Sequence, residues 1–270
     1  MKIKIQKPRG MKDIFLDDAD FYLKVRDLIT NFSLINGFKY IETPIIENIK
    51  LFTSSLGEAS DVVNKEMFLV KGKEKGDIFV LRPEGTASIV RAYFENGMQN
   101  LPQPVCLFYF GKMFRRERPQ HGRLREHNQW GLEILNTEDP FADFYVIFSF
   151  YNFLKSLKIQ NLKVKLNSIG CQRCRRKYKT QLVNFYKKYK NNLCFDCQRR
   201  LKLNPLRLLD CKNPKDQEYK KSAPNILNCL CKFCETHFQK VIEFLDYFQI
   251  PYELDNTLVR GFDYYVKTVF

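Results

Sequence analysis

Apolar and polar positions along the first part of the chain predict a helix followed by a short strand. Apolar residues recur at every third or fourth position over residues 17–36, which is typical of an amphipathic helix. Three aspartates near its start suit the positive end of the helix dipole. Residues 38–46 favour a strand, but Pro44 interrupts it. We therefore expect an edge or interface strand there.

Two hairpins with a helix between them are predicted next. Residues 67–70 and 78–81 alternate around a turn that contains glycines, and a helix is expected from Thr86 to Asn96. The second hairpin pairs residues 105–114 with 128–135 through a long arginine-rich loop. Because strands exceed crossover helices, the predicted fold class is α+β, with a largely antiparallel sheet flanked by helices.

The composition changes after a predicted helix at 140–157 and a short strand at 162–166. The following stretch is rich in cysteine and basic residues and predicts a small, mostly helical insertion. A helix near 235–248 follows the cysteine-rich residues 171–234, and residues 264–270 are strand-like. The expected domains are a core formed by residues 1–170 and 252–270 and an inserted domain formed by residues 171–251.

Composition restricts the class of protein. Of 270 residues, 44% are hydrophobic and 28% are charged, which is typical of a globular chain. No apolar run is long enough for a membrane helix, and the start lacks the apolar core of a secretory signal, so we expect a cytoplasmic protein. The formal net charge of +15 favours a polyanionic partner such as nucleic acid. Lysines spread over every face would give the same charge.

Nine cysteines are unevenly placed, with Cys106 alone and eight between Cys171 and Cys234. In a reducing compartment, paired cysteines with two residues between them indicate tetrahedral zinc before disulfides. Buried or free thiols are the alternative. The predicted zinc ligands are Cys171, Cys174, Cys194 and Cys197, and the predicted second set is Cys211, Cys229, Cys231 and Cys234.

The loop of the second hairpin carries five arginines within residues 115–125. Guanidinium groups match phosphate oxygens in pairs and stay charged at any relevant pH. At the edge of a rigid sheet, such a loop would bind a nucleoside triphosphate or the end of an RNA. A basic hairpin that only faces solvent is the alternative interpretation.

Two further segments combine polar residues with turns. Leu81–Thr86 predicts a strand that runs into a helix capped by Thr86, with Glu84 as a carboxylate for a substrate ammonium group. Arg260, Tyr264 and Tyr265 lie in residues 258–270, where a turn precedes a predicted strand. Since side chains alternate along a strand, only one of these tyrosines would face a given side. A plain strand–turn–helix junction and a plain hairpin are the alternatives.

Together these segments resemble the histidyl-tRNA synthetase family, whose members are class II aminoacyl-tRNA synthetases. The resemblance begins at Lys7 and runs to Phe270. Residues 37–47 resemble the first class II motif, with Pro44 at its dimer interface. The arginine loop resembles the second motif, which grips ATP and the tRNA acceptor end, and residues 258–270 resemble the histidine-specific signature.

The resemblance implies roles in binding histidine. Glu84, Thr86 and Gln129 would hold the ammonium group. Glu133 and Tyr265 would contact the imidazole, a pairing that satisfies both ring nitrogens. An amino acid without those polar groups would leave the protein's own groups unpaired, which penalises it.

The resemblance also implies an ATP site. Arg115 and Arg123 would bind the phosphates, with Glu117 in the same loop. Arg260 would contact the α-phosphate and, with Arg115, would stabilise charge that develops during the reaction. His127 stands where the family usually has a phenylalanine that stacks on adenine, and imidazole offers less stacking area.

The implied activity is histidine–tRNA ligation in two steps, with ATP supplied as its magnesium complex and histidine tRNA as acceptor. A homodimer is implied as well. One rival is a non-catalytic paralogue such as a regulatory subunit of ATP phosphoribosyltransferase, which Arg115, Glu133, Arg260 and Tyr265 disfavour. Another is a zinc-dependent RNA-binding module. The third ATP-binding motif and the anticodon-binding domain of the family would follow Phe270, so we expect this chain to fold and dimerise but to aminoacylate poorly or not at all.

Overall fold

The computed structural model describes residues 5–56, 62–74, 76–262 and 264–270. The chain forms two compact units, Met1–Thr137 and Glu138–Phe270. The expected core and insertion follow a different division. The second unit contains the whole predicted insertion together with the helix and strand that precede it.

In the described part of the first unit the helices are α1 (Asp17–Ile35), α2 (Ile49–Leu56) and α3 (Thr86–Glu95), with short helical turns η1 (Val62–Glu66) and η2 (Met98–Asn100). Its strands are β1 (Lys39–Tyr40), β2 (Ile46–Asn48), β3 (Phe68–Lys71), β4 (Ile78–Leu81), β5 (Val105–Phe114) and β6 (Glu126–Leu135).

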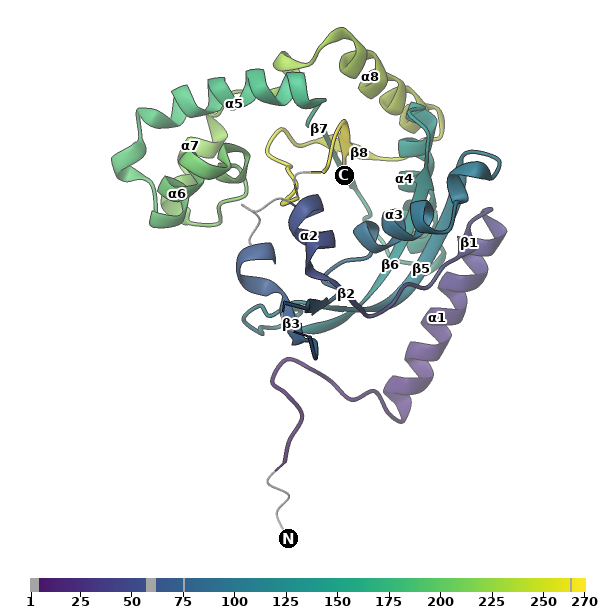
Figure 1. Ribbon diagram of the computed structural model, residues 1–270. Coiled ribbons are helices and arrows are strands. Elements are labelled where there is room, and N and C mark those ends of the chain that lie inside the picture. The colour runs from purple at the N-terminus through teal and green to yellow at the C-terminus, as the bar shows by residue number, and fades with distance from the viewer. Residues whose placement is uncertain (1–4, 57–61, 75, 263) are drawn as a thin grey trace. The chain divides into compact units, whose positions relative to one another are not determined.

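The long hairpin β5–β6 organises the first unit (Figure 1). Its two strands pair antiparallel over their whole length, and β1 joins β5 in parallel. Helix α1 lies along one face of this sheet, where the Trp130 indole N–H donates a 3.2 Å hydrogen bond to the Ser33 hydroxyl. On the other face, Ile89 and Tyr93 of α3 share a buried apolar cluster with Leu107 and Met113 of β5.

This pairing decides which side chains can gather around the start of α3. Residues directly opposite each other on antiparallel strands share a face of the sheet. Tyr109 lies opposite Gly131, Gly111 opposite Gln129, and Leu107 opposite Glu133. The odd-numbered residues of β6 therefore face α3, while Trp130 faces α1.

A second sheet, in the order β2-β4-β3, is antiparallel throughout. Two arginines connect this sheet to neighbouring segments of the first unit. Arg82, directly after β4, is 5% exposed and donates hydrogen bonds to the carbonyl oxygens of Thr43 (2.6 Å) and Lys112 (3.0 Å). Arg91 of α3 pairs with Glu47 of β2 at 2.7 Å.

The second unit is mainly helical. Its described helices are α4 (Pro140–Ser156), α5 (Gln172–Lys187), α6 (Phe195–Leu203), α7 (Pro214–Lys221) and α8 (Lys232–Tyr247), with short helical turns η3 (Lys190–Asn192), η4 (Pro205–Leu208) and η5 (Ile226–Cys229). Its strands are β7 (Val164–Ser168), β8 (Tyr252–Leu254) and β9 (Thr268–Val269), in the sheet order β8-β7-β9.

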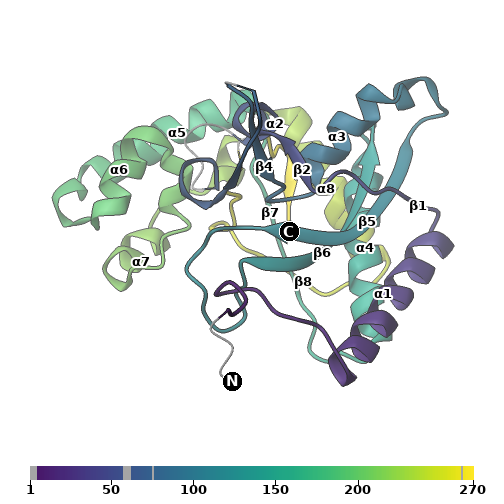
Figure 2. The same ribbon diagram turned by 60° about the horizontal axis from the view of Figure 1, so that its bottom comes forward.

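Two apolar clusters hold this unit together. Helices α4 and α8 pack side by side on the sheet, with Phe144 and Val241 buried between them. Helix α4 starts sharply because Asp139 accepts a hydrogen bond from the Phe141 N–H at 2.8 Å and Pro140 follows the cap. Tyr178 of α5 belongs to the other cluster, which gathers α5, α6 and the turns between them (Figure 2).

The α+β fold class is confirmed, as is the helical character of the cysteine-rich stretch. Antiparallel pairs exceed parallel ones, because only β1–β5 and β7–β8 run parallel in the described residues. The strands form three separate three-stranded sheets there.

Two predicted strands were wrong in extent. Residues 38–46 split into β1 and the start of β2, with Pro44 in the break. Only Thr268–Val269 of residues 264–270 is a strand. Tyr264 and Tyr265 therefore lie outside any strand.

Candidate active site

A buried carboxylate begins helix α3. Glu84 is 2% exposed, and its two oxygens accept 2.8 Å hydrogen bonds from the backbone N–H groups of Thr86 and Ala87. Burial raises the pKa of Glu84, while those N–H groups and the charge of Arg115 oppose the shift. The prediction that Thr86 caps this helix was wrong. The N-cap is Gly85, and the Glu84 carboxylate satisfies the first N–H groups instead.

A second carboxylate faces the same helix start from β6. The Thr86 hydroxyl donates a 2.8 Å hydrogen bond to Oε1 of Glu133. Shielding from water raises the pKa of Glu133 to about 7, and the charge of Glu84 adds to the shift, whereas the Thr86 bond opposes it. Two carboxyl groups and one hydroxyl thus converge in a site that would favour a cationic or hydrogen-bond-donating ligand.

Gln129 extends this polar cluster along β6. Its Nε2 donates a 3.0 Å hydrogen bond to the Tyr109 hydroxyl, and its Oε1 is buried without a hydrogen-bond partner in the described residues. The Tyr109 ring lies between two glycines: a Cβ added at Gly85 or Gly131 would come within 2.3 Å of ring atoms. The glycines therefore make room for the ring that orients Gln129.

The arginine loop between β5 and β6 is tied down at several points. Nε of Arg115 donates to the Pro83 carbonyl at 2.9 Å, beside Glu84, and Arg123 pairs with Glu117 at 2.7 Å. The Arg125 N–H donates to the Gly10 carbonyl at 2.7 Å, so the N-terminal segment lies against this loop (Figure 2).

His127 lies in β6 opposite Met113, near the foot of the arginine loop. Burial lowers the pKa of His127, and the positive charge of Arg115 lowers it further, while Glu117 opposes both. Burial and Arg115 therefore favour the neutral imidazole over the protonated one.

Arg260 and Tyr265 lie in the second unit. The Arg260 guanidinium is 5.9 Å from the Tyr265 ring centre, and Tyr265 stacks on Tyr264 with ring centres 4.7 Å apart. The expectation that these tyrosines point to opposite sides was wrong, because the chain turns there instead of extending. Asp263 of the same segment lies outside the described residues. The first unit thus brings Glu84, Thr86, Gln129 and Glu133 together, and the second brings Arg260 and Tyr265 together.

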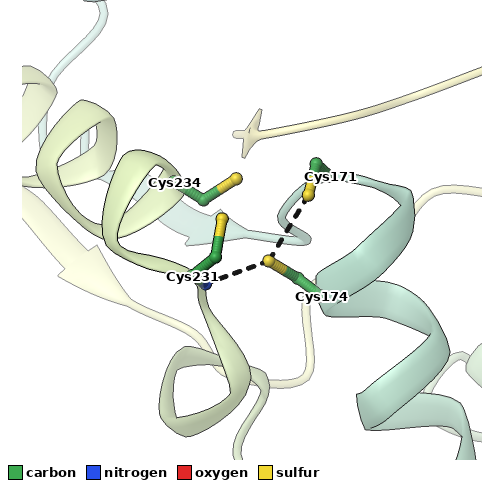
Figure 3. Close-up of side chains that lie close together, drawn as sticks. All are labelled: Cys171, Cys174, Cys231 and Cys234. Atoms are coloured by element: carbon green, nitrogen blue, oxygen red, sulfur yellow. Dashed lines mark hydrogen bonds between the residues drawn. The ribbon is translucent and has the colours of Figure 1, made fainter.

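The cysteines of the second unit form two groups. Cys171, Cys174, Cys231 and Cys234 are the first, shown in Figure 3, and Cys194, Cys197, Cys211 and Asp216 are the second. Within each group the ligand atoms all lie within 4.8 Å of one another. The predicted grouping was wrong, because the first cysteine pair meets the last pair and not the middle one. Cys229 belongs to neither group and donates to Gln181 at 3.1 Å.

Each cysteine pair lies at the start of a helix, and this position explains why its two side chains come together. Cys171, Cys194 and Cys231 are the N-cap residues of α5, α6 and α8. A second cysteine three positions later therefore lies on the same side of the first turn. Hydrogen bonding from the backbone N–H of Cys174 lowers the pKa of Cys171 to about 6, and the N–H of Cys234 lowers the pKa of Cys231.

The histidyl-tRNA synthetase family model matches residues 10–174, more than half of the chain. This chain belongs to that family. The histidine–tRNA ligase of Desulforamulus reducens is 43% identical over 265 residues, which are 98% of this chain and 63% of that protein. The histidine–tRNA ligase of Thermotoga maritima is 44% identical over 268 residues, which are 99% of this chain and 63% of that protein. The chain thus spans less than two thirds of the length of these relatives.

Solved structures agree with this family assignment. The apo histidyl-tRNA synthetase of S. aureus matches with a TM-score of 0.74 and 33% identity, over 98% of this chain and 60% of that chain. An ATP phosphoribosyltransferase regulatory subunit/histidyl-tRNA synthetase from Bacillus halodurans matches with a TM-score of 0.69 over 99% of this chain and 72% of that chain. At 22% identity, the latter shows only a shared fold. Among the described helices, none has the length and apolar character required to cross a bilayer.

Sequence reasoning missed two residues of these sites. Tyr109 was missed because an aromatic residue in an apolar strand looks like an ordinary core residue. The available signal was Gly131, a glycine within the opposite strand, which indicates a bulky neighbour. Asp216 was missed because a search for cysteine spacing ignores carboxylates. Its position five residues after Cys211 was the available signal.

Proposed function

We propose that this chain is the catalytic part of a histidine–tRNA ligase, which activates histidine with ATP and transfers it to histidine tRNA. The observation that carries the proposal is the cluster of Glu84, Thr86, Gln129 and Glu133 at the start of α3, in a chain that belongs to this family. The chain covers only 63% of the length of a relative such as the Desulforamulus reducens ligase, so the complete ligase activity is proposed for it and not shown.

The cluster has the chemistry needed to bind the histidine ammonium group. Glu84 is buried, so its carboxylate gains from a cation that enters the site. Oε1 of Gln129 is a buried acceptor that an ammonium N–H would satisfy. Thr86 would complete the site. Glu133 would accept from an imidazole N–H. The resemblance to the family gives Tyr265 a role in binding the imidazole as well.

ATP would lie beside the arginine loop. Arg115, anchored at Pro83 next to Glu84, would contact its phosphates, as would Arg123 with Glu117. His127 would stack on the adenine. Arg260 would contact the α-phosphate.

The reaction needs positioning and charge neutralisation more than covalent help from the protein. A histidine carboxylate oxygen attacks the α-phosphorus of ATP, supplied as its magnesium complex, and pyrophosphate leaves. Arg115 and Arg260 would stabilise the charge that builds on the phosphate oxygens. The ribose hydroxyl at the end of the tRNA then attacks the histidyl carbonyl, and AMP leaves.

The remaining partners are proposed from charge and exposure. A formal net charge of +15 supports tRNA as the acceptor, and we place the protein in the cytoplasm as its site of protein synthesis. Tyr40, Ile45 and Ile46 are 51%, 44% and 49% exposed, and Pro44 is exposed among them. An apolar strip of this kind supports a homodimer through the first class II motif.

The cysteine groups support structural zinc in the second unit. Thiolates of this number and proximity suit a tetrahedral soft metal. Zinc would have no part in the chemical steps. Its role would be to fix to one another the helix starts that carry the cysteines.

Histidine-dependent exchange of labelled pyrophosphate into ATP tests the proposal. Exchange with histidine alone among the amino acids is the expected result, and it should fall strongly in Glu133→Gln. Glu126→Gln is the matched control, since Glu126 lies on the same strand but pairs with Lys112. A regulatory paralogue would bind histidine without exchange, and an RNA-binding module would bind tRNA without binding histidine.

A further inference from the structure

Three cysteine pairs and two further ligands divide between two places in the second unit. We propose that each place binds its own zinc ion, one in a four-cysteine site and one in a site of three cysteines and an aspartate. This inference rests on the zinc proposal above and deepens it by fixing the number of ions and the ligands of each. It does not depend on the catalytic proposal.

The four-cysteine site joins the starts of α5 and α8 (Figure 3). Sγ of Cys171 and Sγ of Cys174 are 3.6 Å apart. Tetrahedral zinc with Zn–S bonds of about 2.3 Å requires sulfurs separated by about 3.8 Å, whereas a disulfide requires about 2.05 Å. The Cys231 N–H donates to Sγ of Cys174 at 3.1 Å, the kind of outer contact that orients a thiolate ligand.

The second site gathers Cys194 and Cys197 at the start of α6, Cys211 after η4, and Asp216 in α7. Sγ atoms of Cys194 and Cys211 are 3.9 Å apart, again the separation suited to a shared zinc. The Asn213 N–H donates to Sγ of Cys211 at 3.4 Å and supports the thiolate.

Asp216 gives the second site an independent argument. It is 2% exposed, although a lone buried carboxylate is costly unless a cation or hydrogen bonds compensate it. One oxygen accepts from the Cys194 N–H at 3.1 Å, and the other lies 3.3 Å from Sγ of Cys211. An oxygen placed among three sulfurs is a fourth ligand that zinc accepts, and softer sites for copper or iron–sulfur clusters do not call for it.

The two ions would stabilise different parts of the unit. The four-cysteine site closes a long loop, because its two halves lie at opposite ends of the cysteine-rich stretch. The second site fixes α6 to α7 within that stretch. Each would contribute folding energy by fixing to one another the segments that carry its ligands. Loss of one ion is therefore expected to leave the other bound.

Metal analysis of the whole chain, purified without chelator, tests this directly. We expect two zinc ions per chain. Cys171→Ser with Cys174→Ser should keep one, and Cys194→Ser with Cys197→Ser should also keep one. Cys106→Ser and Cys229→Ser are the controls and should keep two. One ion in the unaltered chain would overturn the two-site inference while zinc binding stands, and none would overturn both. Neither result bears on histidine-dependent exchange.

Cobalt substitution keeps the inference testable if a serine variant fails to fold. Tetrahedral Co²⁺ absorbs through sulfur-to-metal charge transfer in proportion to its thiolate ligands. We expect seven thiolates shared by two cobalt ions in the unaltered chain and eight in Asp216→Cys. Unchanged charge-transfer intensity in a folded Asp216→Cys protein that binds two ions would show that residue 216 is no ligand, and the proposed second site would be wrong.

Discussion

The hydroxyl of Thr86 donates a 2.8 Å hydrogen bond to the carboxylate of Glu133, while the backbone N–H of Thr86 binds Glu84. One threonine thus connects two shielded carboxyl groups that come from different elements. Glu84 performs the capping, which leaves the Thr86 hydroxyl available to Glu133. The cluster therefore combines a helix start with the proposed histidine site, and the charge of Glu133 depends on pH near neutrality.

The free energy of unfolding should depend on the ionisation of Glu133. The pKa of Glu133 is raised to about 7 in the folded protein from an ordinary value of 4.5. At low pH the Glu133 carboxyl group is protonated in both the folded and the unfolded chain. As pH rises from about 4.5 to about 7, the unfolded chain releases this proton first, so the free energy of unfolding falls, and above about 7 it stays constant. Glu133→Gln removes this loss. The difference in unfolding free energy between the Glu133→Gln protein and the parent chain should therefore be about 2–3 kcal/mol more favourable to the variant at pH 8 than at pH 5.

Urea unfolding at the two pH values would measure this difference. Glu126→Gln replaces a carboxylate on the same strand that pairs with Lys112, and it serves as the matched control. An equal shift for Glu133→Gln at pH 5 and pH 8 would mean that the carboxyl group is ionised throughout.

Variants of Glu133 and Arg123 should affect the binding of different substrates, histidine for Glu133 and ATP for Arg123. Glu133→Ala should weaken histidine binding by about 1.5–3 kcal/mol, roughly tenfold to more than a hundredfold, because the hydrogen bond that its carboxylate is proposed to accept from the imidazole would be lost. ATP binding should change little. Arg123→Ala should show the reverse pattern. Calorimetric titration with each substrate makes the comparison, and equal losses of both in a folded Glu133→Ala protein would refute the assigned role.

The contact between Tyr109 and Gly131 should appear as an energetic coupling. A Cβ at residue 131 would lie 2.3 Å from the Tyr109 ring, so Gly131→Ala should cost about 1–3 kcal/mol of stability. In a Tyr109→Ala background the added methyl meets no ring, and most of that cost should vanish. Denaturant unfolding of the four proteins gives the coupling energy. Additive effects would show that the ring is not what requires glycine.

The pattern-based predictions succeeded where the information was local. Alternation along β5 and β6 predicted the hairpin, and helical spacing predicted α1, because each residue's burial there follows from its immediate neighbours. The same information could not show that Thr86 would turn towards Glu133 while Glu84 capped the helix. That choice depends on the face that β6 presents to α3.

The cysteine groups show the same limit at longer range. Spacing predicts that Cys171 and Cys174 share a metal, but it does not say which other pair comes to meet them. That partner is set by the packing of α5 and α8, which brings Cys231 and Cys234 alongside. Asp216 carries even less local signal, because its proposed role as a ligand follows only from its burial beside Cys211.

Arg82 should be the arginine whose replacement by lysine costs the most stability. Its guanidinium donates to the Thr43 carbonyl, to the Thr43 hydroxyl at 3.0 Å, and to the Lys112 carbonyl. Burial lowers the pKa of Arg82, and the nearby charge of Glu42 opposes that shift. A lysine ammonium cannot reach the two carbonyls with the geometry of a planar fork.

Arg82→Lys should therefore leave at least one buried acceptor unpaired and cost about 1–3 kcal/mol or more of unfolding free energy. Arg118→Lys, at an exposed position of the arginine loop, is the matched control and should cost almost nothing. Because Thr43 precedes Pro44, loosening Arg82 should also weaken the proposed homodimer, which light scattering across a dilution series would detect. A variant as stable and as dimeric as the control would show that Arg82 does not hold the segment before β2 in place.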